Sequence, residues 1–217
     1  MLSYFTLGTI PEFICLGIAV ISLHKDNAIA WRRNILYLIL VVLIELSGIY
    51  LKTLGEKNSW VYNILVFFEI SFFSLMFQNV LSKYTNSRLI ILLGLGLLLG
   101  FYCYELFSHG YDKRHHLTII ILGVVMIVYS LLYFYYLLKD EHYVNLTTSA
   151  EFWWVSAVLI YYFGVTTCNI FYPVLSKFLV KPNEVFSYTF KVLNILLYSL
   201  WSYSFICRRW LTTKSSI

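Results

Sequence analysis

Long apolar stretches, separated by short polar breaks, occupy nearly all of this 217-residue chain. A helix needs about 20 mainly apolar residues to cross the hydrocarbon core of a bilayer, and these stretches have that length. Only 12% of the residues are charged, so no segment has the composition of a separate aqueous domain. We therefore predict an all-α integral membrane protein, a single domain over residues 1–217 with seven transmembrane helices at 4–23, 34–51, 60–81, 89–107, 117–138, 152–175 and 186–207.

The distribution of lysine and arginine predicts the orientation, because cytoplasmic loops retain these residues. No basic residue precedes the first apolar run, which argues against a cleavable signal peptide and favours an outside N-terminus. The breaks after spans one, three and five, with the tail, are more basic than the opposite breaks, which predicts a cytoplasmic C-terminus. The net charge of +5 then indicates contact with lipid headgroups rather than with nucleic acid. The expected cytoplasmic set is Lys25, Arg32, Arg33, Lys83, Arg88, Lys139, Arg208, Arg209 and Lys214; the opposite set is Lys52, Lys57, Lys113, Arg114, Lys177 and Lys181.

Four ionisable side chains lie inside the predicted hydrocarbon region, each on a different span: Glu12, Glu45, Glu69 and Lys191. A charge at mid-membrane costs about 2.5–3.5 kcal/mol on insertion scales, so such residues normally face the bundle interior and mark functional sites. The helical rise places all four roughly 8–14 Å below the outer boundary. We expect Lys191 to pair with the carboxylate of Glu69 or Glu45, unless its side chain extends to the membrane surface instead.

Uncharged polar residues occur at the same depth and predict a pocket in the outer half of the membrane. Lys191, Asn194 and Tyr198 follow the spacing of one helical face, and the sixth span carries a similar stripe that includes Thr166. The alternative interpretation is that these stripes only supply hydrogen bonds between helices. The predicted ligand-binding residues are Glu12, Glu45, Asn63, Glu69, Tyr162, Asn169, Lys191, Asn194 and Tyr198.

The break between the fourth and fifth spans contains His109, Asp112, His115 and His116. Imidazole and carboxylate groups can bind a divalent metal. A solvated loop is the interpretation that we favour, so we predict no metal site and no cofactor. The four cysteines lie singly, without a CxxC pair, and are expected to be small core residues.

Three local patterns predict contacts at helix ends and between helices. Residues 148–151 have a capping-box pattern that would start the sixth span. Gly96 and Gly100 form a small-xxx-small pair that would let another helix approach the fourth span closely. Tryptophans near span ends, including Trp31 and Trp154, are expected at the membrane interface.

The last two spans carry the most specific sequence pattern: EFWW at 151–154, YYFG at 161–164, FY at 171–172, and NILLY at 194–198 followed by Arg208 and Arg209. This pattern resembles the seven-transmembrane sensor modules that precede bacterial histidine kinases, especially the aromatic-rich proteins of Bacteroidetes type. The resemblance implies a signal-receiving bundle in the cell inner membrane with a cytoplasmic output. Only ten residues follow residue 207, so we expect a signal to leave through a separate partner protein.

The leading hypothesis is therefore a membrane sensory or regulatory bundle that binds a small or lipid-like ligand and signals in trans. An intramembrane lipid-modifying enzyme could use Glu45 or Glu69 as a general acid or base, but the chain has no His-Glu-x-x-His motif and no Ser-His-Asp arrangement. A small proton-coupled transporter would also contain buried carboxylates, but no internal repeat is visible. A retinal-binding pump is disfavoured because Lys191 lies too near the end of its span.

Overall fold

The computed structural model describes residues 9–140, 145–178 and 181–214, with side chains described as far as residue 211. Within these ranges the chain forms seven α-helices and no strand, which confirms the all-α prediction. The helices are α1 Thr9–Leu23, α2 Ile29–Thr53, α3 Ser59–Leu81, α4 Arg88–His109, α5 His116–Lys139, α6 Ala150–Leu175 and α7 Pro182–Lys214.

Six helices, α2 to α7, are long and apolar enough to cross a bilayer. This indicates a multi-pass membrane protein. The described part of α1 has 15 residues and extends about 22 Å, compared with about 30 Å for the hydrocarbon core. Residues 4–8, where the first predicted span begins, lie outside the described residues. The first of the seven predicted spans therefore stays a prediction.

The outer surface of the bundle is apolar, as expected for helices that contact lipid. Leu36, Leu92 and Phe107 are among many large apolar side chains that are more than half exposed. Soluble monomers rarely expose contiguous apolar patches larger than a few hundred Å². A hydrocarbon environment satisfies such a surface.

Two helices begin four or five residues before the predicted spans, because polar residues continue the helix past the apolar segment. α2 begins at Ile29 rather than at residue 34, so the exposed Arg32 and Arg33 lie in its first turns. α7 begins at Pro182, a residue whose fixed φ angle suits the first helical position. Long basic side chains at helix ends can reach the aqueous surface while their stems stay in the apolar layer.

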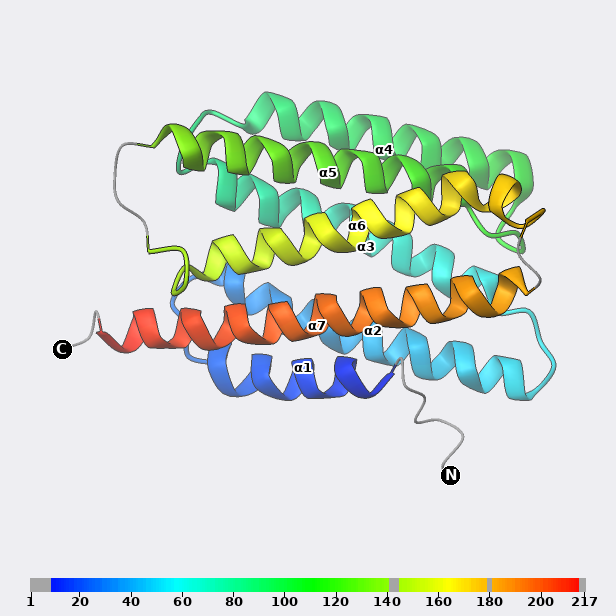
Figure 1. Cartoon of the computed structure of the whole chain (residues 1–217), viewed down its shortest axis with the longest axis horizontal. Coiled ribbons are helices and arrows are strands. Elements are labelled where there is room, and N and C mark those ends of the chain that lie inside the picture. Colours follow the sequence, from blue (N-terminus) through cyan, green and yellow to red (C-terminus); the bar gives the residue numbers. More distant parts are fainter. Residues whose placement is uncertain (1–8, 141–144, 179–180, 215–217) are drawn as a thin grey trace.

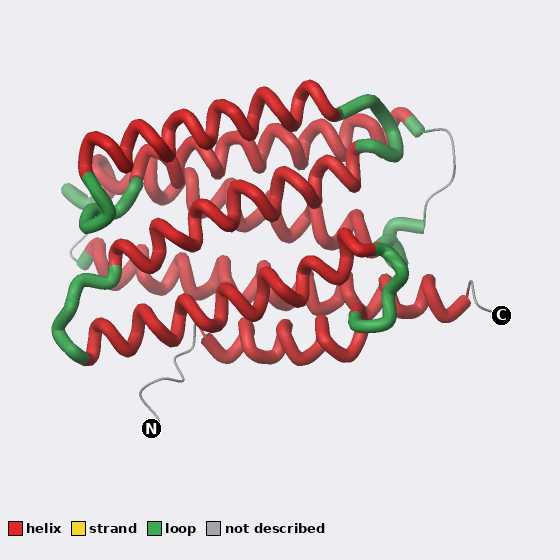
Figure 2. Tube along the Cα trace, turned by 180° about the vertical axis from the view of Figure 1, so that it is seen from behind, coloured by secondary structure: helices red, strands yellow, loops and turns green. Residues whose placement is uncertain are grey.

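The helices run up and down along the long axis of the molecule (Figure 1), and the loops lie at its two ends (Figure 2). Consecutive helices pack against one another, and α1 also packs against α7, so that the first and last helices close the bundle. α4 packs on α3 and α5 and lies at the edge of the bundle (Figure 1).

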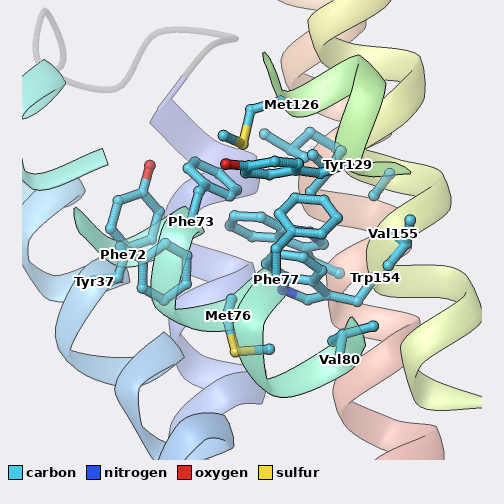
Figure 3. Close-up of a cluster of buried hydrophobic side chains, with 14 of the residues drawn as sticks. Tyr37, Phe72, Phe73, Met76, Phe77, Val80, Met126, Tyr129, Trp154 and Val155 are labelled. Carbon is cyan, nitrogen blue, oxygen red and sulfur yellow. The ribbon is translucent and has the colours of Figure 1, made fainter. Parts of the chain in front are cut away.

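Aromatic rings from α2, α3, α6 and α7 fill the centre of the bundle (Figure 3). Trp154 and Trp201 stack with their ring centroids 5.7 Å apart, and Phe73 contacts both rings. Tyr37 stacks on Phe72 with a centroid distance of 4.0 Å. Each such pair contributes about 0.5–1.5 kcal/mol beyond the burial of its surface. Because these contacts join four helices, they hold the central helices in register.

Trp31 and Trp154 lie near the ends of their helices, and both rings are buried inside the bundle. Their exposed fractions are 1% and 0%. The Trp154 indole Nε1 donates a 3.0 Å hydrogen bond to Asn34 Oδ1, and Asn34 Nδ2 donates to the Trp31 carbonyl oxygen at 3.0 Å. The buried asparagine supplies the acceptor that a buried indole N–H needs, so the Trp154 ring can pack between helices.

The start of α6 differs from the predicted capping box. Ser149 is the N-cap, and its hydroxyl oxygen accepts a hydrogen bond from the Phe152 amide at 3.3 Å. Glu151 forms an ion pair with Lys83 of the α3–α4 loop. The carboxylate therefore links the first turn of α6 to the α3–α4 loop.

The close helix contact on α4 occurs at Gly94 and not at the predicted pair. A Cβ atom built on Gly96 or Gly100 would meet nothing within 4 Å among the described residues. A Cβ atom on Gly94 would collide with the hydroxyl group of Tyr129 on α5. The Tyr129 hydroxyl donates to the carbonyl oxygens of Ile90 and Ile91 at 3.3 and 3.4 Å, which fixes its position over Gly94.

An ion pair connects the end of α7 to the loop between α1 and α2. Arg208 donates to both carboxylate oxygens of Asp26, at 2.7 and 3.2 Å, and its guanidinium lies 5.4 Å from the centroid of the Trp31 ring. Burial raises the pKa of Asp26, but the hydrogen bonds from Arg208 and from the Ala28 amide outweigh burial and hold that pKa below its ordinary value. Asp26 is therefore a carboxylate at neutral pH.

Candidate functional site

The structure gives the predicted intramembrane carboxylates tyrosine partners instead of a lysine partner. The Tyr37 hydroxyl donates to Glu69 Oε1 at 3.1 Å, and the Tyr62 hydroxyl donates to Glu45 Oε2 at 3.1 Å. A hydroxyl donor can stabilise either protonation state of a carboxyl group, because it can also accept a hydrogen bond. Each of these two hydrogen bonds therefore joins α2 to α3.

Glu12 has the smallest exposed fraction of the three acids. It is 3% exposed, and its Oε2 atom is buried without a hydrogen-bond partner among the described residues. It lies within electrostatic range of Glu45, and Tyr198 of α7 lies within electrostatic range of Glu12. Glu12 therefore belongs to the polar part of the interior, as the sequence predicted.

Tyr162 and Tyr198 also point into the bundle. Both side chains are buried, and the Tyr162 ring packs edge-on against Phe73 with a centroid distance of 5.4 Å. The Tyr162 hydroxyl is buried without a hydrogen-bond partner in the part of the chain that the structure describes. The stripe of α6 that carries Tyr162 and Thr166 thus faces inward, as the spacing of its polar residues indicated.

Asn63 is fully buried, and its contacts are with a loop. Its Nδ2 atom donates to the carbonyl oxygens of Tyr111 and Lys113, at 3.0 and 2.8 Å, and its Oδ1 atom accepts from the His115 amide at 3.2 Å. These three bonds hold the α4–α5 loop over the end of α3. They also position Arg114 within electrostatic range of Glu45 and Glu69.

The predicted pairing of Lys191 with a carboxylate is wrong in this structure. The Lys191 ammonium lies 5.2 Å from the centroid of the Tyr188 ring, and no ion pair of Lys191 occurs among the described residues. Tyr188 stands one helical turn before Lys191, so a local cation–π contact competes with a contact across the bundle. The cation that approaches the acids comes instead from the loop, at Arg114.

Three of the predicted polar residues meet in a cavity between α6 and α7. Asn169 lies on α6, and Lys191 and Asn194 lie on α7. The cavity has a volume of about 680 Å³ and lies near the end of the bundle where α5 and α7 begin. Its other lining residues are His116, Ile120, Cys168, Tyr172, Pro173, Asn183, Phe186, Ser187 and Phe190.

The predicted residues therefore do not form one site. Asn169, Lys191 and Asn194 border the α6–α7 cavity, whereas the carboxylates and the two tyrosines belong to the central interior. Neither Asn63 nor its loop partners border that cavity. The sequence indicates how deep a residue lies along its span, but it does not show how each helix is rotated about its axis. Residues of similar depth were therefore assigned to one pocket although they face different parts of the bundle.

The histidine group of the α4–α5 loop does not gather around a common point. His115 is fully buried, with its ring edge-on to Tyr102 at 5.2 Å and its Nε2 atom 3.3 Å from the Gly110 carbonyl oxygen. His116 and Asp112 are exposed. No group of three possible metal-binding side chains lies together within the described residues.

Glu105 was missed from the sequence although it organises this end of the bundle. Its carboxylate accepts hydrogen bonds from the Leu117 amide at 3.1 Å, the Thr118 amide at 2.7 Å and the Thr118 hydroxyl at 2.6 Å. An acid at the N-terminus of a helix is stabilised by the free amides and by the helix dipole. The sequence contains a feature that could have predicted this role: Glu105 is an acidic residue near the end of the fourth predicted span, twelve positions before the fifth span begins.

Comparison with known proteins finds no family model, no curated protein and no solved structure that matches this chain.

Proposed function

We propose that this chain is a membrane sensory or regulatory bundle that binds a small, lipid-like ligand and acts on a partner protein in trans. The observation that carries the proposal is the α6–α7 cavity, which brings together Asn169, Lys191 and Asn194. Pockets of about 300–1,000 Å³ with apolar walls and a few convergent polar groups are typical of small-molecule sites. The proposed setting is the cell inner membrane, with this cavity in the outer half of the bilayer.

The lining of the cavity favours an amphiphilic ligand with an anionic or carbonyl-bearing head. Lys191 supplies a positive charge, and the amides of Asn169 and Asn194 supply donors and acceptors beside it. Phe186, Phe190 and other apolar side chains form the rest of the wall and suit a hydrocarbon chain. No acidic side chain borders the cavity among the described residues, so an anionic head meets no repulsion there.

The position of α7 offers a route by which binding would change the opposite end of the bundle. α7 contacts α6 on one side and α1 on the other, and its far end is joined to the α1–α2 loop through Arg208 and Asp26. A ligand between α6 and α7 that prefers one position of α7 would shift the population of that position. A partner at the cytoplasmic end would then detect the change.

Ligand binding is testable by thermal unfolding of the purified protein in a mild non-ionic detergent, with laurate as the anionic probe and dodecanol as the neutral probe. We expect laurate to raise the unfolding temperature of the wild type more than dodecanol does. Lys191→Met removes the cation that attracts the head, so it should abolish the difference between the two probes. A ligand present at ten times its Kd stabilises a protein by about 1.4 kcal/mol.

Lys177→Met is the matched control, because Lys177 is an exposed lysine of the α6–α7 loop that does not border the cavity. It should respond to laurate as the wild type does. Equal responses of the wild type and Lys191→Met to laurate would contradict the proposed site. The signalling part is tested separately in the host, where Lys191→Met should reproduce the gene-expression profile of a deletion strain.

An intramembrane enzyme is the second candidate, and the buried Glu12 together with the half-buried Glu45 and Glu69 favours it as a source of a general acid or base. It predicts turnover of a lipid substrate that Glu69→Gln abolishes while ligand binding at Lys191 persists. Absence of product from total lipid extracts incubated with the wild type would remove this candidate.

A further inference from the structure

Two adjoining hollows on the α2–α3–α4 side of the molecule form one surface feature. The first lies at the end of the bundle where α2 and α4 begin and has a volume of about 1000 Å³. The second is a groove of about 350 Å³ between α3 and α4. Leu75, Gln78 and Arg88 border both, so the end hollow continues into the groove. This feature lies at the opposite end of the bundle from the α6–α7 cavity.

The end hollow is electropositive. Arg33 and Arg88 border it, are exposed, and form no ion pair in the part of the chain that the structure describes. Lys83 adds a third cation, although it is paired with Glu151. No acidic residue is among the described residues that border the hollow.

The N-termini of α2 and α4 both lie in this hollow and add free backbone donors to the cations. The residues before them, Ala28 and Ser87, form no side-chain cap. First-turn amides and the positive ends of two helix dipoles therefore point toward the hollow, which favours a bound anion. Ser87 itself borders the hollow and is 1% exposed, and its hydroxyl has no hydrogen-bond partner among the described residues.

The groove has the lining of a hydrocarbon site. Phe67, Leu92, Leu95 and Leu99 form most of its walls. From Arg88 to Leu99 it follows about 17 Å of α4, which is close to the thickness of one leaflet of the hydrocarbon core. Ser74 borders the groove with a buried hydroxyl that has no hydrogen-bond partner in the described residues.

We propose that this composite surface is a binding site for an anionic phospholipid. The phosphate group would bind between Arg33, Arg88 and the two helix N-termini, with the Ser87 hydroxyl as a further donor. One acyl chain would lie in the groove between α3 and α4. A free phosphate ion could satisfy the hollow alone, but only a lipid uses both the cationic hollow and the apolar groove that continues from it.

Native mass spectrometry of the protein released from detergent micelles tests the proposal with phosphatidylglycerol, phosphatidylcholine and inorganic phosphate as probes. Phosphatidylglycerol should bind at least tenfold more tightly than phosphatidylcholine. The double variant Arg33→Gln/Arg88→Gln should lose that preference. Arg32→Gln is the matched control, because Arg32 is exposed on the same turn of α2 and does not border the hollow; it should retain the preference.

The groove is tested by Leu95→Trp, which places a larger side chain in it, against Leu93→Trp, whose position is exposed and outside it. Leu95→Trp should weaken phosphatidylglycerol binding about tenfold. Leu93→Trp should bind this lipid as tightly as the wild type does. Circular dichroism establishes that each variant is folded; if Leu95→Trp is not, the arginine variant decides. Equal binding of phosphatidylglycerol and phosphatidylcholine to the wild type would overturn the lipid site, and so would an unchanged lipid preference in the arginine variant. The site would also be overturned if inorganic phosphate displaced the lipid completely from both the wild type and Leu95→Trp.

Discussion

At the scale of single residues, the polar groups of this bundle find partners close by. Asn34 bonds to the neighbouring Trp31 carbonyl and to the indole of Trp154, Asn63 holds a loop, and Glu105 holds the first turn of α5. In hydrocarbon an unsatisfied polar group costs several kcal/mol, so each side chain takes the nearest donor or acceptor. The buried hydroxyls and carboxylate oxygens left over, such as that of Glu12, therefore stand out as candidates for ligand or proton binding.

The ion pair between Asp26 and Arg208 leads to a prediction about pH. We expect Asp26→Asn to lower the free energy of unfolding by about 1.5–3 kcal/mol at pH 7, the range for hydrogen bonds to charged groups. Because folding lowers the pKa of Asp26, its contribution is fully present above about pH 4–5 and is lost as the pH falls below the ordinary Asp value. The difference in the free energy of unfolding between the wild type and Asp26→Asn should therefore shrink as the pH falls from 5 to 3.

Thermal unfolding in detergent at a series of pH values measures this difference. Glu56→Gln is the control, because Glu56 is an exposed acid in the α2–α3 loop. It should change the unfolding temperature little at any pH. A difference between wild type and Asp26→Asn that stays constant from pH 7 to pH 3 would show that the charge of Asp26 does not stabilise the fold.

At the scale of the helices, the sequence predicted which segments are helical but not how each helix is rotated about its axis. Apolar length alone places α2 to α7, because the hydrocarbon core requires about 20 apolar residues. It does not distinguish Gly94 from Gly96, since both are small residues in an apolar run and only the position of Tyr129 separates them. For the same reason the partners of Glu45 and Glu69 were not identified, and only Asn169, Lys191 and Asn194 of the nine predicted pocket residues border the α6–α7 cavity.

The contact between α4 and α5 predicts opposite effects of two glycine substitutions. Gly94→Ala should destabilise the protein by about 1–3 kcal/mol, because the new methyl group overlaps the Tyr129 hydroxyl. Gly96→Ala should be neutral or stabilise by up to about 1 kcal/mol, since alanine is the better helix former and the space beside it is open.

Thermal unfolding of both variants checks this, and Tyr129→Phe gives an internal test. Removing the hydroxyl makes room for the methyl group, so Gly94→Ala/Tyr129→Phe should be more stable than the sum of the two single changes predicts. Equal stabilities of Gly94→Ala and Gly96→Ala would contradict the close contact.

At the scale of the whole molecule, the two ends of the bundle differ in composition. The end where α2 and α4 begin carries the electropositive hollow, with Arg33 and Arg88, and also the Lys83–Glu151 and Asp26–Arg208 pairs. Cytoplasmic leaflets are rich in anionic lipid and cytoplasmic loops retain basic residues. The cytoplasmic position of this end stays a prediction, since it rests on the same basic residues that the loops contain.

Reporter fusions test that orientation. A green fluorescent protein fused after residue 217 should fluoresce, and alkaline phosphatase fused in the loop at residue 56 should be active, because that loop is expected outside. Alkaline phosphatase activity from the fusion after residue 217 would reverse the orientation and move the α6–α7 cavity to the inner half of the membrane.

The contact between α1 and α7 also constrains how the protein is made. Synthesis at about 5–20 residues per second brings α7 into the membrane roughly 9–35 s after α1. Throughout that interval the side of α1 that carries Glu12 has not yet met its neighbour, since Tyr198 and the rest of α7 are still to come. Until α7 arrives, the ionisable side chain of Glu12 lacks part of the protein surface that shields it from lipid, so the last helix completes the burial of a group on the first.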